Sequence, residues 1–202
     1  MGLFSKLFKK NISVGVTSEN FSTSNPECLK LFELKKYMDM LLSENQYIPK
    51  SGYRNRLLED KKTIEYFAVL DNSGMLKSFC DSNKIDVSAV ETTLNRYRNF
   101  EAKVDAHNEE YIQRAMKSEK TYLDNILHDV DPKIKLDDDQ RRVILTDEDY
   151  CLVIAGAGAG KTTTVAAKVK YLVEKKDIDP SQILVVSFTN KAVQELRDKL
   201  NK

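Results

Sequence analysis

A glycine-rich stretch in the last quarter of the chain constrains the fold more than any other feature. The apolar run at 150–155 leads into glycine-rich residues 156–160, and Lys161, Thr162 and Thr163 follow directly. Glycines allow a tight turn in which successive backbone N–H groups point inward, and such a concave backbone binds anions. A helix that follows the loop would add the partial positive charge of its N-terminus. The stretch therefore predicts a phosphate-binding loop.

The order of residues is that of the P-loop of nucleoside triphosphatases, and each position has an expected role. Lys161 and Thr162 are the predicted catalytic residues: the lysine reaches the β- and γ-phosphates, and the threonine hydroxyl binds Mg²⁺. Other nucleotide contacts are expected from Ala155, Gly156, Ala157, Gly158, Ala159, Gly160 and Thr163. The strict signature begins with glycine, whereas this chain has Ala155 at that position.

The pattern around the loop predicts an α/β fold. Continuous apolar runs at 150–155 and 183–188 are typical of buried parallel strands. Helical periodicity is expected at 136–145, 162–175 and 191–200. The order predicts the opening βαβα of a RecA-like P-loop domain over 131–202, with too few strands for a complete sheet. No acidic motif for Mg²⁺ follows a later strand, so an N-terminal fragment that is inactive by itself is expected.

Upstream, the sequence predicts a helical accessory region over 25–130, preceded by a flexible N-terminus at 1–24. Three helices are expected first, at 26–45, 54–70 and 75–82. From Asp86 to about His128 an apolar stripe with a period near 3.5 residues indicates a long helix, which either pairs antiparallel with earlier helices or is broken near residues 107–108. The predicted fold class is therefore mixed, all-α followed by α/β.

Composition and cysteine spacing exclude several classes of protein. The net charge of +1 gives no basic footprint, so any contact with DNA must be made by a local groove. Cys28, Cys80 and Cys151 have no metal-binding spacing and indicate reduced thiols in a cytoplasmic protein. No apolar run approaches the roughly 20 residues of a membrane span. The basic, amphipathic segment 1–10 is more simply a mobile N-terminus than a membrane contact.

Three segments, in this order, resemble the motifs of superfamily 1A DNA helicases of the UvrD/Rep type. Residues 136–142 resemble the Q motif, which implies that Gln140 reads the adenine edge and that the nucleotide is ATP. Residues 155–162 resemble helicase motif I, whose first position is alanine in this family, so Ala155 supports the resemblance.

The third segment, 187–192, is similar to motif Ia, which contacts single-stranded DNA. The resemblance implies DNA contacts by Phe188, Thr189 and Asn190, since an aromatic ring at a strand end can stack on a base. The alternative is that Phe188 is a core residue at the end of a buried strand.

The long upstream helix that leads into the Q-like segment is similar to that of the helicase IV branch. The residues that carry this resemblance are His107, Asn108, Glu110 and Tyr111. This resemblance implies that the intact protein uses ATP and Mg²⁺ to move 3′ to 5′ on single-stranded DNA, as DNA repair helicases do. One departure is Thr163, where many relatives have arginine. Two other functions stay open: a subunit of a helicase–nuclease or anti-phage defence helicase, or a helical module that binds a protein partner and carries a vestigial NTPase segment.

Overall fold

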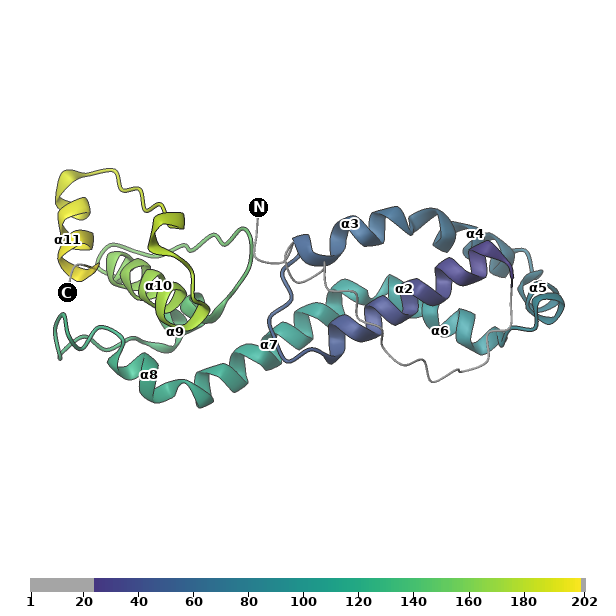
Figure 1. Ribbon diagram of the computed structural model, residues 1–202, viewed down its shortest axis with the longest axis horizontal. Helices are drawn as coiled ribbons and strands as arrows, with labels where there is room; N and C mark the ends of the chain where they lie inside the picture. The colour runs from purple at the N-terminus through teal and green to yellow at the C-terminus, as the bar shows by residue number, and fades with distance from the viewer. Residues whose placement is uncertain (1–23, 201–202) are drawn as a thin grey trace. The chain divides into compact units, whose positions relative to one another are not determined.

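The computed structural model describes residues 24–200, and the chain divides into two units, 1–107 and 108–202 (Figure 1). The division falls within one helix, and each unit has its own hydrophobic core. The flexible N-terminus predicted at 1–24, including the amphipathic segment 1–10, lies outside the described residues except for residue 24.

The first unit is built from helices. They are α2 (Pro26–Ser43), α3 (Ser51–Glu59), α4 (Lys61–Asn72), α5 (Leu76–Asn83), α6 (Val87–Arg98) and the first part of α7 (Phe100–Ser118). The start of α2 follows from its sequence: the Asn25 side chain accepts from the backbone N–H of Glu27 at 3.0 Å, and Pro26 needs no N–H partner. No helix within residues 24–200 is both long and apolar enough to cross a bilayer.

The core of the first unit joins α2, α4 and α6. Leu34 and Met38 of α2, Phe67 of α4 and Leu94 of α6 are almost completely buried. Phe100 closes the core with its ring edge-on to Tyr53, at a centroid distance of 5.4 Å. Each such side chain stabilises the fold by about 1.5–3 kcal/mol relative to an exposed one.

Two expected helices are interrupted at polar residues. The segment predicted as one helix at 54–70 is divided at Asp60, between α3 and α4. The stripe from residue 86 to 128 is divided at Asn99 and Glu119, and not near residues 107–108, which lie inside α7. The Asn99 side chain donates to the backbone oxygen of Asn95 at 2.9 Å, so it competes with the helical backbone for that acceptor.

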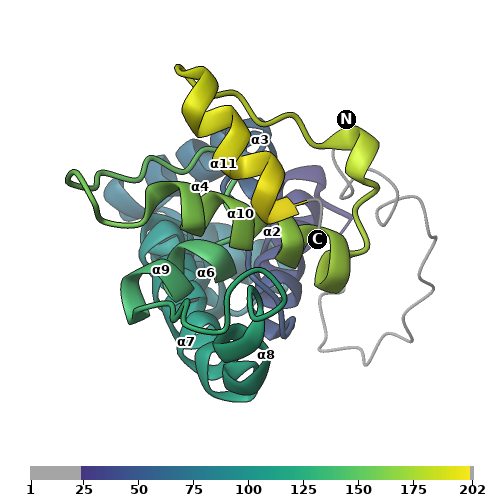
Figure 2. The same ribbon diagram turned by 90° about the vertical axis from the view of Figure 1, so that its left-hand side faces the viewer.

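The second unit is also helical in the described residues. It contains the rest of α7, then α8 (Lys120–Asn125), α9 (Asp138–Leu145), α10 (Lys161–Lys176), the short 3₁₀ helix η1 (Pro180–Gln182) and α11 (Asn190–Leu200). Its core is formed by Leu123, Ile126 and Leu127 together with Ile144 of α9 and Ala167 of α10. Helix α11 lies beside α10 and contributes Leu196 to the same core (Figure 2).

The predicted βαβα arrangement was wrong. No strand forms anywhere in residues 24–200, and the two segments expected as strands are extended connections. Their side chains are exposed: Ile154 keeps 90% of its accessible surface and Leu184 keeps 86%. A parallel strand is stable where neighbouring strands accept its backbone hydrogen bonds and both faces are covered, and these two segments have neither. Helices, and not a sheet, therefore position the glycine-rich loop.

Candidate nucleotide-binding site

The glycine-rich loop ends where α10 begins, as the sequence predicts. Gly158 and Gly160 have φ angles of 78° and 72°, in the left-handed region that a side chain disfavours. Gly160 is the N-cap of α10, and its carbonyl accepts from the backbone N–H of Thr164 at 2.8 Å. The loop therefore delivers its backbone to the N-terminus of a 16-residue helix, where unpaired N–H groups bind anions.

Lys161 is the first residue of α10, and its ammonium turns back onto the loop. Its Nζ atom donates to the backbone oxygens of Ala155 at 3.1 Å and Gly156 at 2.6 Å. The first two predicted nucleotide contacts of the loop, Ala155 and Gly156, therefore bind this charged group through their backbone oxygens. A phosphate that enters the loop can replace these two carbonyls as the acceptor of the ammonium, because a charged acceptor binds an ammonium more strongly than a neutral carbonyl does.

Gln140 lies against the other end of the loop. Its Nε2 atom donates to the backbone oxygen of Ala159 at 3.2 Å, and a Cβ on Gly160 would lie only 2.5 Å from that nitrogen. Its Oε1 atom accepts from the backbone N–H of Asp137 at 3.0 Å, while the Asp137 side chain accepts from the Gln140 N–H at 2.8 Å. This reciprocal capping box at the start of α9 fixes which end of the amide is the donor.

An open cavity of about 680 Å³ adjoins these groups. Gln140 and Lys161 both line it, and so do Val143 of α9 and Val165 of α10. The structure therefore brings the predicted adenine contact and the predicted phosphate contact to one cavity that has polar groups and apolar walls. This combination is typical of small-molecule sites.

Lys168 is a half-buried charged residue that the sequence reasoning missed. Its ammonium donates to the backbone oxygens of Ile144 at 2.7 Å and Thr146 at 2.6 Å, at the C-terminal end of α9. Burial lowers the pKa of Lys168, and the nearby Asp147 opposes that shift. A sequence signal was present, because Lys168 lies three residues after Val165 and four before Leu172, so the lysine shares one helix face with two apolar residues.

Two aromatic hydroxyls tie α10 to the helices before it. The Tyr171 hydroxyl donates to Glu119 at 3.2 Å, and the Tyr122 hydroxyl donates to Glu174 at 2.8 Å. Burial is the main cause that raises the pKa of both tyrosines, and the adjacent carboxylates add to it. Both phenols are therefore neutral donors across the physiological range, and they hold the helix that carries Lys161.

Thr162 and Thr163 lie half-buried in the first turn of α10. The Thr163 hydroxyl accepts from the ammonium of Lys199 at 3.0 Å, a contact between α10 and α11. Sequence reasoning could not find this pair, because 36 residues separate its members and no local pattern links them. In residues 24–200 no cluster of three or more His, Cys, Asp or Glu side chains could hold a metal ion.

The oxygen donors near the loop fit Mg²⁺ only when the ion is bound together with the nucleotide. Mg²⁺ keeps several waters and is commonly bound through one or two protein groups and substrate phosphates. The Thr162 hydroxyl can supply one such group from the first turn of α10.

The predicted DNA contacts lie between the second extended segment and α11. Phe188 is fully exposed, so it is not the core residue that the alternative interpretation expected. The Thr189 hydroxyl accepts from the backbone N–H of Ala192 at 3.2 Å, and Asn190 is the first residue of α11. An exposed ring next to a helix start can stack on a base while nearby N–H groups meet a phosphate.

Comparison with known proteins finds a family match for the part of the chain that carries this site. Residues 136–202 match the model of the UvrD/REP helicase N-terminal domain. This segment is UvrD-like. The UvrD-like segment begins at Leu136, one residue before the capping box of α9, and contains the loop, Lys161 and α11. No solved structure matches the chain.

Several curated relatives share the UvrD-like segment. A probable DNA helicase II homolog of Mycoplasma capricolum is 46% identical over 65 residues, which are 32% of this chain and 9% of that protein. The ATP-dependent DNA helicase UvrD1 of Mycobacterium leprae is 36% identical over 78 residues, 39% of this chain and 9% of that protein. The ATP-dependent DNA helicase PcrA of Staphylococcus aureus is 38% identical over 64 residues, 32% of this chain and 9% of that protein. The chain therefore spans about a tenth of the length of these relatives.

Proposed function

We propose that the UvrD-like segment is the nucleotide-binding part of an ATP-dependent DNA helicase. The observation that carries this proposal is the position of Gln140, whose amide bonds the loop carbonyl of Ala159 while Lys161 begins the helix that follows the loop. A base-reading amide and a phosphate-binding ammonium then belong to one site. The relatives named as ATP-dependent DNA helicases support the same activity.

In this proposal the loop N–H groups and the N-terminus of α10 bind the phosphates, and Lys161 stabilises charge that develops on the γ-phosphoryl group. Thr162 contributes a hydroxyl to Mg²⁺, which neutralises phosphate charge when bound. Gln140 has one amide hydrogen and one lone pair left after its two observed bonds. Adenine offers a matching acceptor and donor on one edge, so the amide favours ATP.

Binding of single-stranded DNA is the second part of the proposal. Phe188 supplies a stacking surface that tolerates any base, and Thr189 and Asn190 bond the backbone or base beside it. The expected outcome of ATP turnover is movement 3′ to 5′ along one strand, in the manner of the helicases that the chain resembles. The names of the relatives favour this motor over a helical module with a vestigial loop. The three free cysteines and the DNA partner are consistent with a cytoplasmic location.

The direct test is a calorimetric titration of the 202-residue chain with Mg²⁺·ATP, before and after Lys161→Ala. Loss of a charge-assisted contact is expected to weaken ATP binding about tenfold or more. Lys117→Ala is the matched control, because Lys117 is an exposed lysine on α7 outside the site.

Far-UV circular dichroism should show the same helix content for all three proteins. ATP affinity that is equal in Lys161→Ala and Lys117→Ala would refute the nucleotide site.

A further inference from the structure

The ammonium of Lys199 lies beside the phosphate-binding loop. It donates to the hydroxyl of Thr163, the third residue of α10, at 3.0 Å. A Cβ on Gly160 would lie 4.0 Å from the Thr163 Cβ, so the Thr163 side chain borders the last residue of the loop. Helix α11 therefore brings a positive charge to the N-terminus of α10, where a phosphate would bind.

The other charges around the loop do not favour an anion. Helix α9 begins with Asp138 and Asp139, after its N-cap Asp137, and two of these three carboxylates line the cavity shared with Lys161. The arginines of α9 do not offset them. Arg141 pairs with Asp124 at 2.5 Å, and Arg142 pairs with Glu109 at 2.6 Å.

Asp137, Asp139 and Glu148 line this cavity together with Lys161 and Lys168, and the Lys168 ammonium is already bound by two backbone oxygens. A bound triphosphate would add several negative charges to the same region. Like charges at short range repel, so a further protein cation would strengthen the binding of a polyphosphate beyond what Lys161 and Mg²⁺ supply.

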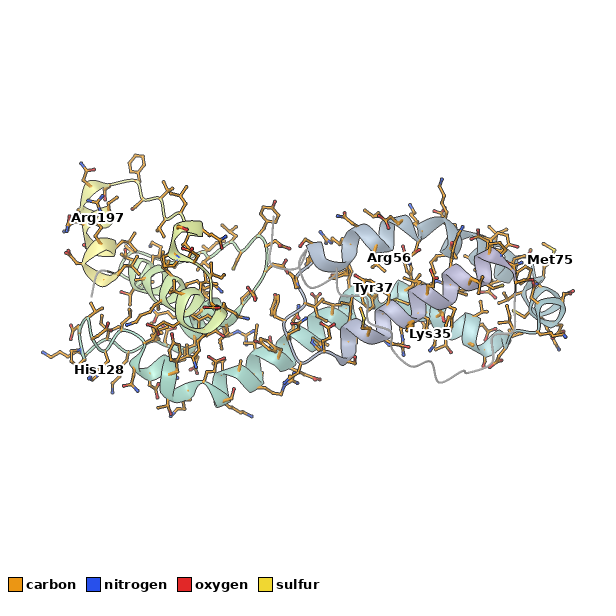
Figure 3. The ribbon with its side chains drawn as sticks, in the orientation of Figure 1. Lys35, Tyr37, Arg56, Met75, His128 and Arg197 are labelled. Atoms are coloured by element: carbon orange, nitrogen blue, oxygen red, sulfur yellow. The ribbon has the colours of Figure 1, made fainter. Side chains whose placement is uncertain are left out.

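Lys199 is available for that role. Within residues 24–200 it has no carboxylate partner within 4.0 Å, whereas Lys170 and Lys176 of α10 are paired with Asp129 and Asp147. Its observed partner, the Thr163 hydroxyl, is neutral. Arg197 of the same helix is exposed (Figure 3), and residues two positions apart on a helix face different directions.

We propose that Lys199 is a second phosphate-binding cation of the nucleotide site, delivered by α11 across the first turn of α10. The ligand class is a nucleoside di- or triphosphate, because a single ammonium in the loop can already hold a lone phosphate. The inference rests on the proposed function, since it adds a binding residue to the same site. It also gives α11 a direct part in nucleotide binding.

The test is titration of the full 202-residue chain with ATP, ADP and AMP, in wild type, Lys199→Met and Lys199→Arg. Lys199→Met keeps the length of the side chain and removes the charge. This change is expected to weaken the binding of ATP and ADP about tenfold and the binding of AMP much less. Lys199→Arg is expected to stay within about twofold of wild type, because it keeps a cation with a similar reach.

Arg197→Met is the control for a loss of one positive charge on α11, and no change in affinity is expected. Equal losses for ATP and AMP in Lys199→Met would show a structural effect and overturn the inference, as would equal affinities in Lys199→Met and Arg197→Met. If Lys161→Ala weakens ATP binding but Lys199→Met does not, the proposed function stands and the role of Lys199 as a second cation is refuted. If neither change has an effect, the nucleotide site itself is refuted.

Discussion

At the scale of single residues, the hydrogen bonds of the Gln140 amide support its proposed role in adenine recognition. A free glutamine amide can rotate and present either its donor or its acceptor to a ligand. Here the N–H of Asp137 requires an oxygen and the carbonyl of Ala159 requires a nitrogen, so only one orientation satisfies both. The remaining donor and acceptor then have fixed positions, which is what specific hydrogen bonding to adenine needs.

Gln140→Glu tests this orientation. The carboxylate still accepts from the N–H of Asp137 and preserves the cap of α9, but it cannot donate to Ala159 or to a base nitrogen. We expect the preference for ATP over GTP to fall about tenfold, the value of one or two lost hydrogen bonds. Competition titrations with the two nucleotides measure it. An unchanged ratio in a protein that still binds ATP would remove Gln140 from base recognition.

At the scale of elements, several helices could be predicted, although not all of their interruptions, and the strands could not. The cap at Asn25 and the apolar spacing in α2 depend on neighbours in the sequence, so α2 begins at the predicted residue. The runs at 150–155 and 183–188 have the apolar character of strands, but a strand also needs partners from elsewhere in the fold. The tight glycine turn before α10 could be expected because its glycine conformations and the start of the helix are local properties, whereas its binding of phosphate stays a prediction.

The ion pair between α7 and α9 predicts a specific acid sensitivity. Arg142 makes two hydrogen bonds to Glu109, at 2.9 and 2.6 Å. These bonds lower the pKa of Glu109 to about 2, with a further hydrogen bond from Gln113. The unfolded chain would protonate this group near its ordinary pKa of about 4.3. The pair therefore stabilises the fold above that pH, and its contribution is lost as the pH falls toward 2.

Glu109→Gln should flatten this part of the stability profile. The thermal midpoint is measured between pH 2 and pH 6 for wild type, Glu109→Gln and the control Glu110→Gln, whose partner Arg114 is 3.8 Å away. The midpoint should fall less steeply with acid in Glu109→Gln than in the other two proteins. Parallel profiles in all three would show that the pair does not contribute.

At the scale of the whole molecule, the sequence indicated two functional regions but placed their boundary at residue 130. That boundary stays a prediction. By their internal contacts, residues 1–107 and 108–202 form two compact units, so the end of α7 and all of α8 belong to the unit that contains the loop. The physical reason is the apolar face of α10. Its residues Ala167 and Tyr171 pack in one core with Leu123 and Leu127, which precede the UvrD-like segment. A repeating apolar stripe shows that a helix has a partner, but it does not show which one.

The two cores predict that damage to one unit leaves the site in the other intact. Phe67 is completely buried in the first core, where it meets the ring of Phe79 at 5.8 Å. Phe67→Ala should destabilise that unit by about 3–5 kcal/mol. Hydrogen exchange should then accelerate in peptides from residues 24–107, while peptides from 108–200 and the affinity for ATP stay as in wild type.

Leu58→Ala is the control for this experiment, because Leu58 is 68% exposed in the same unit and little apolar burial is lost with it. It should leave exchange unchanged in both units. Faster exchange around α10, or weaker ATP binding, in Phe67→Ala would mean that the first unit supports the loop directly. The nucleotide site would then depend on the whole helical chain and not only on residues 108–200.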